Sequence, residues 1–250
     1  MIPRLYCDQP LADGAIAALT AEQAHYLRGV LRRKEGDGIL LFNPRDGEFA
    51  ATLTEVSKKG AAAALGRQTR MREAEPDIHL LFAPVKRAAI EMIVQKGTEL
   101  GASAFLPVIT DRTNADRLRA DRLTIIATEA AEQCGRLSVP PVGPTTTLAD
   151  ALLHWDKARV LYYCDEAGDD PSREWGGAEG RAAPKLEVVG AVGAGPAAIL
   201  IGPEGGFTPA ERQWLRALPF VHPVSLGPLI LRADTAAIAA LTLWRAAARS

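Results

Sequence analysis

Cysteine, histidine and aromatic residues are all scarce in this chain of 250 residues. The three cysteines, Cys7, Cys134 and Cys164, stand far apart, and no Cys-x-x-Cys pair occurs. This spacing indicates neither a disulfide framework nor a zinc site, and it is typical of a protein from a reducing compartment. The four histidines are scattered as well, so we expect no metal centre.

Long hydrophobic runs and a strong net charge are also missing. No apolar stretch approaches the length of a membrane span, and the N-terminus lacks the apolar region of a signal peptide. We therefore expect a soluble, cytoplasmic protein with no membrane partner. The net charge of −1 creates no field that would attract nucleic acid to the whole molecule, so any such contact needs a local basic patch. A hydrophobic content of 48% suffices to bury a core.

The first 70 residues show the pattern of short strands and turns that is typical of a small β-barrel or meander. Short apolar or alternating runs at 38–43, 48–56 and 60–66 are separated by Pro-Arg-Asp-Gly and Ser-Lys-Lys-Gly turns. The preceding segment 20–37 predicts a helix, because Ala24, Leu27, Val30 and Leu31 recur at helical spacing. Its basic residues are Arg28, Arg32, Arg33 and Lys34. They form either a solvated face or a patch that contacts phosphates.

From about residue 77 the pattern changes to strands that alternate with helices. The predicted strands are 78–84, 104–110, 158–164, 197–201 and 222–227, and the intervening helices include 115–134 and 146–155. This alternation predicts an α/β unit with a parallel sheet covered on both faces. Residues 165–196 are rich in Gly, Asp and Pro and read as a long, mobile insertion without assignable chemistry.

A glycine-rich loop, "GPEGGFTPAE" at 202–211, follows one of these strands. Thr208, Pro209 and Glu211 have the spacing of an N-cap, a first helical residue and a capping-box acid, so a helix begins at a defined place. The phosphate-loop pattern Gly-x-x-x-x-Gly-Lys-Ser/Thr is absent, and Glu204 would repel a phosphate. The loop suits a ligand with hydroxyls, an amino group or a positive centre. A tight structural turn is the alternative.

A second loop, "SLGPLILRADTAAIAAL" at 225–241, follows the last predicted strand. It places three large apolar residues, 229–231, beside Arg232. Asp234 or Thr235 can cap the helix that follows. That helix is apolar nearly all round, which favours a place in the core or at a subunit interface. Ligands of open parallel sheets bind where strands run into such loops.

Five segments of the chain resemble one known family. "HYLRGVLRRKEGD", "QKGTELGA", "EQCGRLSVP", "LIGPEGGFTPAE" and "LGPLILRADTA" are similar, in this order, to the RsmE family of ribosomal RNA methyltransferases in the SPOUT superfamily. The resemblance implies a PUA-like RNA-binding β-barrel at 1–70 and, at 77–250, a SPOUT α/β domain with a parallel sheet and a C-terminal trefoil knot. It also implies a homodimer that uses S-adenosylmethionine to methylate N3 of one uridine in the 16S rRNA of the 30S ribosomal subunit.

The resemblance also suggests which residues do what. The two loops would hold the cofactor through Leu200, Ile201, Gly202, Pro203, Glu204, Gly205, Gly206, Leu226, Gly227, Leu229, Ile230 and Leu231. RNA would contact Arg4, Arg28, Arg32, Arg33 and Lys34. Arg232 and Arg136 are candidates for stabilising a uridine anion, and Glu204 is a candidate for taking its proton.

The sequence departs from the family pattern at two places. Leu229 stands where the family usually has Arg, and Asp234 where Glu is commoner. Two alternatives stay open at this point. One is a SPOUT methyltransferase that acts on another RNA such as tRNA, or on a ribose 2′-oxygen; the other is a non-enzymatic RNA-binding or assembly protein, which the Leu229 departure slightly favours.

Overall fold

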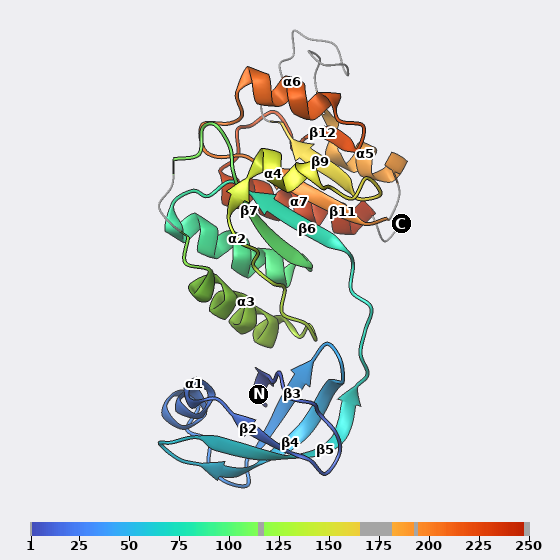
Figure 1. Ribbon diagram of the computed structural model, residues 1–250. Helices are drawn as coiled ribbons and strands as arrows, with labels where there is room; N and C mark the ends of the chain where they lie inside the picture. The colour runs from blue at the N-terminus through green and yellow to red at the C-terminus, as the bar shows by residue number, and fades with distance from the viewer. Residues whose placement is uncertain (1, 115–117, 166–181, 193–194, 248–250) are drawn as a thin grey trace. The chain divides into compact units, whose positions relative to one another are not determined.

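The structure, a computed structural model, describes residues 2–114, 118–165, 182–192 and 195–247 (Figure 1). It divides into two units, Met1–Ala74 with Thr128–Val139, and Glu75–Ala127 with Pro140–Ser250. The short segment Thr128–Val139 thus packs with the first unit, although it follows the first strands of the second along the chain. Each unit is described by itself.

The first unit is built on a curled five-stranded sheet, sheet A, with strand order β1-β3-β4-β5-β2 (Figure 1). Its strands are β1 (Arg4–Tyr6), β2 (Ile16–Leu19), β3 (Gly38–Asn43), β4 (Gly47–Val56) and β5 (Ala61–Arg70). β1 pairs with β3 in parallel, and the other pairs are antiparallel. Alternate residues, such as Ile39, Leu41 and Leu53, point into one buried apolar cluster. The predicted β-rich N-terminal unit is confirmed.

The helix predicted over 20–37 was wrong in its length. Thr20 and Gln23 form a capping box at the start of α1 (Ala21–His25), which runs into the wider turn η1 (Tyr26–Val30). The helical path ends there, because Arg32 has a left-handed φ of 54°. The side chain of Val30, predicted on the buried stripe, is 63% exposed. The basic residues from 32 onward therefore lie in a turn and not on a helix.

The second unit is built on a seven-stranded sheet, sheet B, in which every neighbouring pair is parallel. The strand order is β10-β12-β9-β11-β6-β7-β8. The strands are β6 (Ile78–Phe82), β7 (Ala104–Ile109), β8 (Thr146–Thr147), β9 (Val160–Cys164), β10 (Ala183–Pro184), β11 (Ala197–Ile201) and β12 (Val221–Ser225). The five predicted strands and their parallel arrangement are confirmed. Of the predicted insertion 165–196, residues 166–181 and 193–194 lie outside the described residues. The prediction of a long, mobile insertion was wrong for 183–192, which form β10 and a helix.

Helices cover both faces of sheet B. They are α2 (Arg87–Glu99), α4 (Leu148–Leu153), α5 (Lys185–Val192), α6 (Pro209–Ala217) and α7 (Ala233–Ala247), whereas α3 (Ala120–Cys134) contributes residues to both units. Leu148 and Leu152 of α4 and Leu215 of α6 pack in one buried cluster with strand residues Leu81, Leu161 and Leu200. On α2, Gly97 faces Phe105 of β7 so closely that a Cβ there would lie 2.6 Å from the ring. In the described part of the chain, no helix is long and apolar enough to span a membrane.

The amino-terminal residues of α6 and α7 can be compared with the predicted helix caps. Thr208 and Glu211 form the predicted capping box of α6, with Pro209 in the first turn. α7 begins at Ala233, so the prediction that Asp234 or Thr235 caps it was wrong. The N–H of Ala236 donates to the carbonyl of Arg232 at 2.8 Å, which starts the helical ladder earlier than the polar side chains suggest.

Candidate functional site

A pocket of about 620 Å³ lies at the carboxyl end of sheet B. Its walls come from residues that follow β6, β9, β11 and β12, together with the first turns of α2 and α7. Pockets of open parallel sheets form at this edge because the loops leave the strands there. The volume lies within the range of about 300–1,000 Å³ that is typical of small-molecule sites.

The loop between β11 and α6 forms a fixed wall of this pocket. Gly206 has a φ of 65°, and its N–H closes a turn by donating to the carbonyl of Pro203 at 2.9 Å. The guanidinium of Arg112 donates to the carbonyl of Gly205 at 2.9 Å. Gly202 faces the ring of Phe207, where a Cβ would lie 2.5 Å from the nearest ring carbon. The loop is therefore held at both ends and has no space for a side chain at Gly202.

The loop between β12 and α7 forms the opposite wall. Gly227 adopts a φ of 113°, and its N–H donates to the hydroxyl of Ser225 at 3.0 Å. Leu229 and Ile230, two of its apolar residues, are 76% and 84% exposed. Among the described residues, the N–H groups of 229–231 donate no hydrogen bond. This wall therefore offers an apolar surface together with free backbone donors.

Asp165 lies in the pocket at the end of β9 and is almost fully buried. Its carboxylate accepts hydrogen bonds from Arg212 at 3.0 Å and from Arg216 at 2.8 Å, both on α6. Next to it, Tyr163 packs edge-on against Phe207, and burial raises the pKa of its phenol. These contacts fasten α6 to the sheet and set the depth of the pocket.

Three charged side chains that line the pocket, Lys86, Glu204 and Arg232, are without a partner among the described residues. Glu204 and Arg232 both line the cavity and are exposed, and neither forms a hydrogen bond or ion pair there. Side chains that satisfy no internal contact are available to a ligand. One carboxylate and one guanidinium thus face the same cavity.

The donor set can be compared with the chemistry of S-adenosylmethionine. An adenine fits between apolar walls with backbone donors at its edge, and a carboxylate such as Glu204 can accept from ribose hydroxyls or from an ammonium group. The loop between β11 and α6 has no lysine for a phosphate, and this cofactor has no phosphate; the lysine that lines the pocket, Lys86, comes from the start of α2. The residues present therefore fit it.

Comparison with known proteins gives the family. The sequence profile of the RNA methyltransferase domain matches residues 72–245, and that of the RNA methyltransferase PUA domain matches residues 19–65. A Rickettsia conorii protein called ribosomal RNA small subunit methyltransferase E is 30% identical over 97% of this chain and 94% of its own length. The chain belongs to the ribosomal RNA small subunit methyltransferase E family.

Two solved structures are similar to this member of the methyltransferase E family over nearly its whole length. A putative methyltransferase from Legionella pneumophila, in complex with the bound cofactor SAM, has a TM-score of 0.80 and 26% identity, and covers 99% of this chain and 98% of its own. Methyltransferase E from Neisseria gonorrhoeae, bound to S-adenosyl methionine, has a TM-score of 0.75 and 27% identity, with 98% of each chain covered.

The pocket brings together most of the residues predicted for the methyltransferase cofactor. Three of the twelve stand apart, because Leu200 is buried in the core and neither Gly205 nor Gly227 lines the cavity. The lining residues that the prediction included are Ile201, Gly202, Pro203, Glu204, Gly206, Leu226, Leu229, Ile230 and Leu231. Their role as cofactor ligands stays a prediction.

Sequence reasoning missed one wall of the pocket. Lys86, Ala89 and Met92 of the α2 region line it, as do Cys164 and Asp165 after β9. Both segments follow strands that the sequence did predict. The rule that ligands bind at the carboxyl ends of parallel strands would have found them, although neither segment has a glycine motif.

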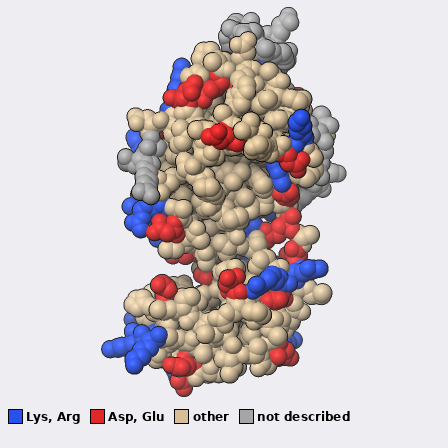
Figure 2. Space-filling model, viewed as in Figure 1, with Lys and Arg blue, Asp and Glu red and all other residues tan. Residues whose placement is uncertain are grey.

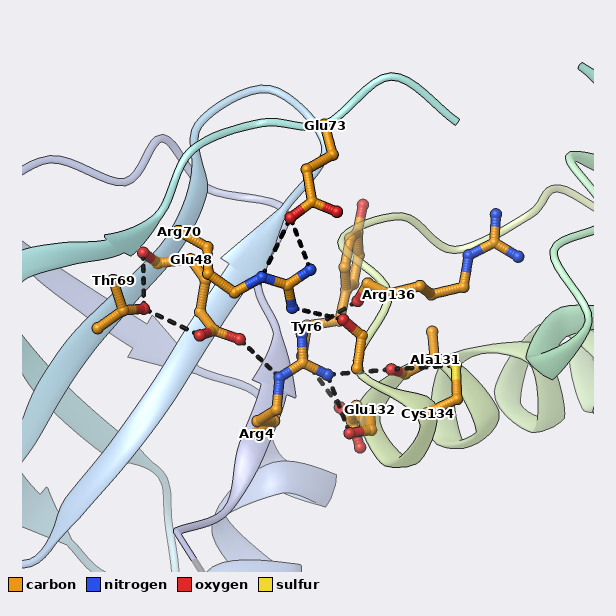
Figure 3. A network of polar contacts seen from close by, with 11 residues as sticks. Arg4, Tyr6, Glu48, Thr69, Arg70, Glu73, Ala131, Glu132, Cys134 and Arg136 are labelled. Atoms are coloured by element: carbon orange, nitrogen blue, oxygen red, sulfur yellow. Dashed lines mark hydrogen bonds and ion pairs between the residues drawn. The ribbon is translucent and has the colours of Figure 1, made fainter. Parts of the chain in front are cut away.

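Two predicted site residues, Arg4 and Arg136, belong to the first unit (Figure 3). The guanidinium of Arg4 donates to the carboxylate of Glu48 at 2.6 Å and to the carbonyls of Ala131, Glu132 and Arg136 at 3.0–3.1 Å. With its side chain 14% exposed, Arg4 mainly holds the 131–136 segment in place. The guanidinium of Arg136 donates to the hydroxyl of Ser138 at 2.9 Å, and Arg136 does not line the pocket.

The basic residues predicted to contact RNA lie on and after η1. Arg28, Arg32 and Lys34 are exposed, and Arg33 is half-buried. They occupy a turn rather than the continuous helical face that was predicted. Within the described parts of the chain, no group of three or more His, Cys, Asp or Glu residues could hold a metal ion.

Proposed function

We propose that the protein methylates N3 of one uridine in 16S rRNA of the 30S ribosomal subunit, with S-adenosylmethionine as methyl donor. The observation that carries the proposal is the pocket at the carboxyl end of sheet B, in which the unpartnered Glu204 and Arg232 face one cavity in a chain of this family. The Neisseria relative bound to S-adenosyl methionine and the SAM-bound Legionella structure support the choice of cofactor.

In this proposal some pocket residues bind the cofactor and others take part in methyl transfer. S-adenosylmethionine, when bound, supplies a methyl group that its sulfonium centre activates. The loops 202–206 and 226–231 would hold the adenine and ribose, with Glu204 accepting hydrogen bonds from hydroxyl or ammonium groups. Orientation by these walls contributes to the rate because the reacting atoms are brought into line.

Arg232 is the side chain best placed to act on the uridine. The N3 proton of uridine is weakly acidic, so a cation beside O2 or O4 stabilises the anion that attacks the methyl group. The guanidinium of Arg232 is exposed in the pocket and free of internal partners among the described residues. Glu204 or a water molecule would take the N3 proton.

The SPOUT topology with its trefoil knot and the homodimer are also part of the proposal. Leu229 and Ile230 line the pocket and are strongly exposed, so a second copy that covers them would also cover part of the cofactor site. The first unit, matched by the PUA-domain profile, would bind RNA through Arg28, Arg32, Arg33 and Lys34. A cytoplasmic location follows from a ribosomal substrate.

Nucleoside mass spectrometry tests the substrate. 16S rRNA from a deletion strain should lack one 3-methyluridine, and the purified protein should restore it on 30S subunits from that strain. Loss of a tRNA or ribose methylation in its place would favour the alternative enzyme. Calorimetry with S-adenosylmethionine addresses the non-enzymatic alternative, because a protein of that class would show no binding.

A further inference from the structure

A second cavity, of about 440 Å³, lies next to the cofactor pocket in the same unit. The two cavities share Val85 and Lys86, at the start of α2. The rest of the second cavity is formed by the first turns of α2, by residues 114 and 118, and by the start of α3. A ligand that extends out of the first cavity along α2 would therefore enter the second.

Cations dominate the rim of this groove. The described lining residues include Lys86, Arg87, Arg119 and Arg122, with Glu91 as their one carboxylate. Figure 2 shows blue side chains close to red ones at the edge where the amino-terminal end of α2 lies. Such a rim attracts anions locally, although the whole chain has a net charge of −1.

The carboxylate in the groove is already neutralised. Glu91 accepts a hydrogen bond from Arg87 at 2.8 Å and lies 3.6 Å from Arg122. The hydrogen bond from Arg87 is the main cause that holds the pKa of Glu91 below its ordinary value. Lys86 is the N-cap of α2 and provides no side-chain cap; the N–H groups of Ala89 and Ile90 donate to its carbonyl, so those of Arg87 and Ala88 stay open to an anion.

The floor of the groove is apolar, unlike its rim. Ile90, Leu118 and Leu123 line it together with Val85. A flat apolar surface under a ring of cations matches a single nucleotide, whose base has an apolar face and whose phosphate is an anion. A double helix would not fit a cavity of this volume. The combination favours single-stranded nucleic acid over a free anion, which would use only the rim.

We propose that this groove binds a nucleotide next to the target uridine in single-stranded RNA. Its phosphate would lie among Arg87, Arg119 and Arg122, and its base over the apolar floor. The shared wall of Val85 and Lys86 then places the neighbouring nucleotide at the mouth of the cofactor pocket. This inference rests on the proposed function, since it assumes that RNA is the substrate.

Charge reversal at Arg119 tests the groove. Arg119 is 74% exposed by side chain and directly precedes α3, and its ion pair with Asp121 at 2.9 Å is exposed too, so its loss costs little stability and Arg119→Glu should fold normally. The matched control is Lys157→Glu, an exposed position next to the amino end of β9, at the opposite edge of the sheet. For methyl transfer to 30S subunits, we expect Arg119→Glu to raise KM about tenfold or more with little change in kcat, and Lys157→Glu to change neither.

Salt dependence gives an independent readout. The slope of log KM against log salt concentration should fall by about 0.7 for each phosphate of a single strand that the variant no longer neutralises. Equal KM values and equal slopes for Arg119→Glu and Lys157→Glu would overturn the inference. A loss of S-adenosylmethionine affinity as large as the rise in KM would also overturn it, because the cations would then bind the cofactor and not the RNA.

A binding assay separates this inference from the proposed function. If the wild-type protein methylates no 30S subunit, the proposed function fails, and fluorescence anisotropy with a short single-stranded RNA still tests the groove. Weaker binding to Arg119→Glu than to Lys157→Glu would support the groove by itself. Equal binding by the two variants would reject it.

Discussion

The carboxylate of Asp165 and the guanidinium of Arg216 form a buried ion pair at 2.8 Å, with side chains that are 1% and 2% exposed. The pair connects the last turn of α6 to the residue that follows β9, and Asp165 also lines the cofactor pocket. Arg212, one turn earlier on α6, donates to the same carboxylate at 3.0 Å. The pocket wall at Asp165 is therefore held in place by a charge network with α6.

Removal of the Asp165 carboxylate should destabilise the fold. In Asp165→Ala the buried guanidinium of Arg216 loses its ion pair with the Asp165 carboxylate, and we expect the free energy of unfolding to fall by about 3–5 kcal/mol. Urea denaturation measures this change. The exposed Asp13 provides a control, since Asp13→Asn should change the stability by less than about 0.5 kcal/mol. Equal stability of Asp165→Ala and the wild type would contradict this view of the network.

Two glycines in one loop should differ in their tolerance of a methyl group. A Cβ at Gly202 would lie 2.5 Å from Phe207, whose buried ring is fixed by its edge-on contact with Tyr163. At Gly205 the nearest atoms, on Arg112, are 3.6 Å away. We expect Gly202→Ala to weaken S-adenosylmethionine binding about tenfold or more, and Gly205→Ala to keep it within about twofold. Calorimetry with S-adenosylmethionine on both variants measures the two affinities. Similar losses of affinity would mean that the close approach of Gly202 to Phe207 does not matter for binding.

Local features of the fold could be predicted from the sequence, and features that depend on distant contacts could not. Five of the seven strands of sheet B and the capping box at Thr208 were predicted because their signals lie within a few residues, whereas the two-residue strands β8 and β10 were missed. The end of η1 was missed because Arg32 takes a left-handed conformation that usually favours glycine.

The grouping of residues into sites shows the same limit. Arg4 was predicted to contact RNA, yet it donates to carbonyls in the 131–136 segment, more than 100 positions away along the chain. Such a contact depends on how α3 ends against sheet A, which no spacing in the sequence reveals. The glycine loops, in contrast, lie at strand ends and could be predicted to face the same pocket.

Arg232 should affect the chemical step more than cofactor binding. Arg232→Ala removes the cation that stabilises the uridine anion, and we expect methyl transfer to 30S subunits to fall about ten- to hundredfold. The affinity for S-adenosylmethionine should stay nearly unchanged, because the pocket walls remain. Arg232→Lys keeps the positive charge but lacks the planar guanidinium, so its rate of methyl transfer should lie between those of the wild type and Arg232→Ala. Unchanged turnover in Arg232→Ala would rule out the assigned role.

Glu132 should make the stability of the protein depend on pH. This half-buried carboxyl accepts the N–H of Tyr6 at 3.0 Å, and burial raises its pKa to about 7 from an ordinary value of 4.5. Between these two values the unfolded chain releases the proton while the folded protein keeps it. Stability from this group is therefore fully present below about pH 4.5 and is lost as the pH rises towards 7.

Glu132→Gln isolates that contribution. The amide oxygen of glutamine can still accept from Tyr6, and it cannot titrate. Between pH 4.5 and pH 8 we expect the free energy of unfolding of the wild type to fall by about 1–3 kcal/mol more than that of the variant. The reason is that only the wild type releases a proton on unfolding in this range. Urea denaturation at several pH values measures the difference. The exposed Glu35 is the control, and Glu35→Gln should follow the wild-type profile. If the stability of Glu132→Gln also follows the wild-type pH profile, burial does not raise the pKa of the Glu132 carboxyl.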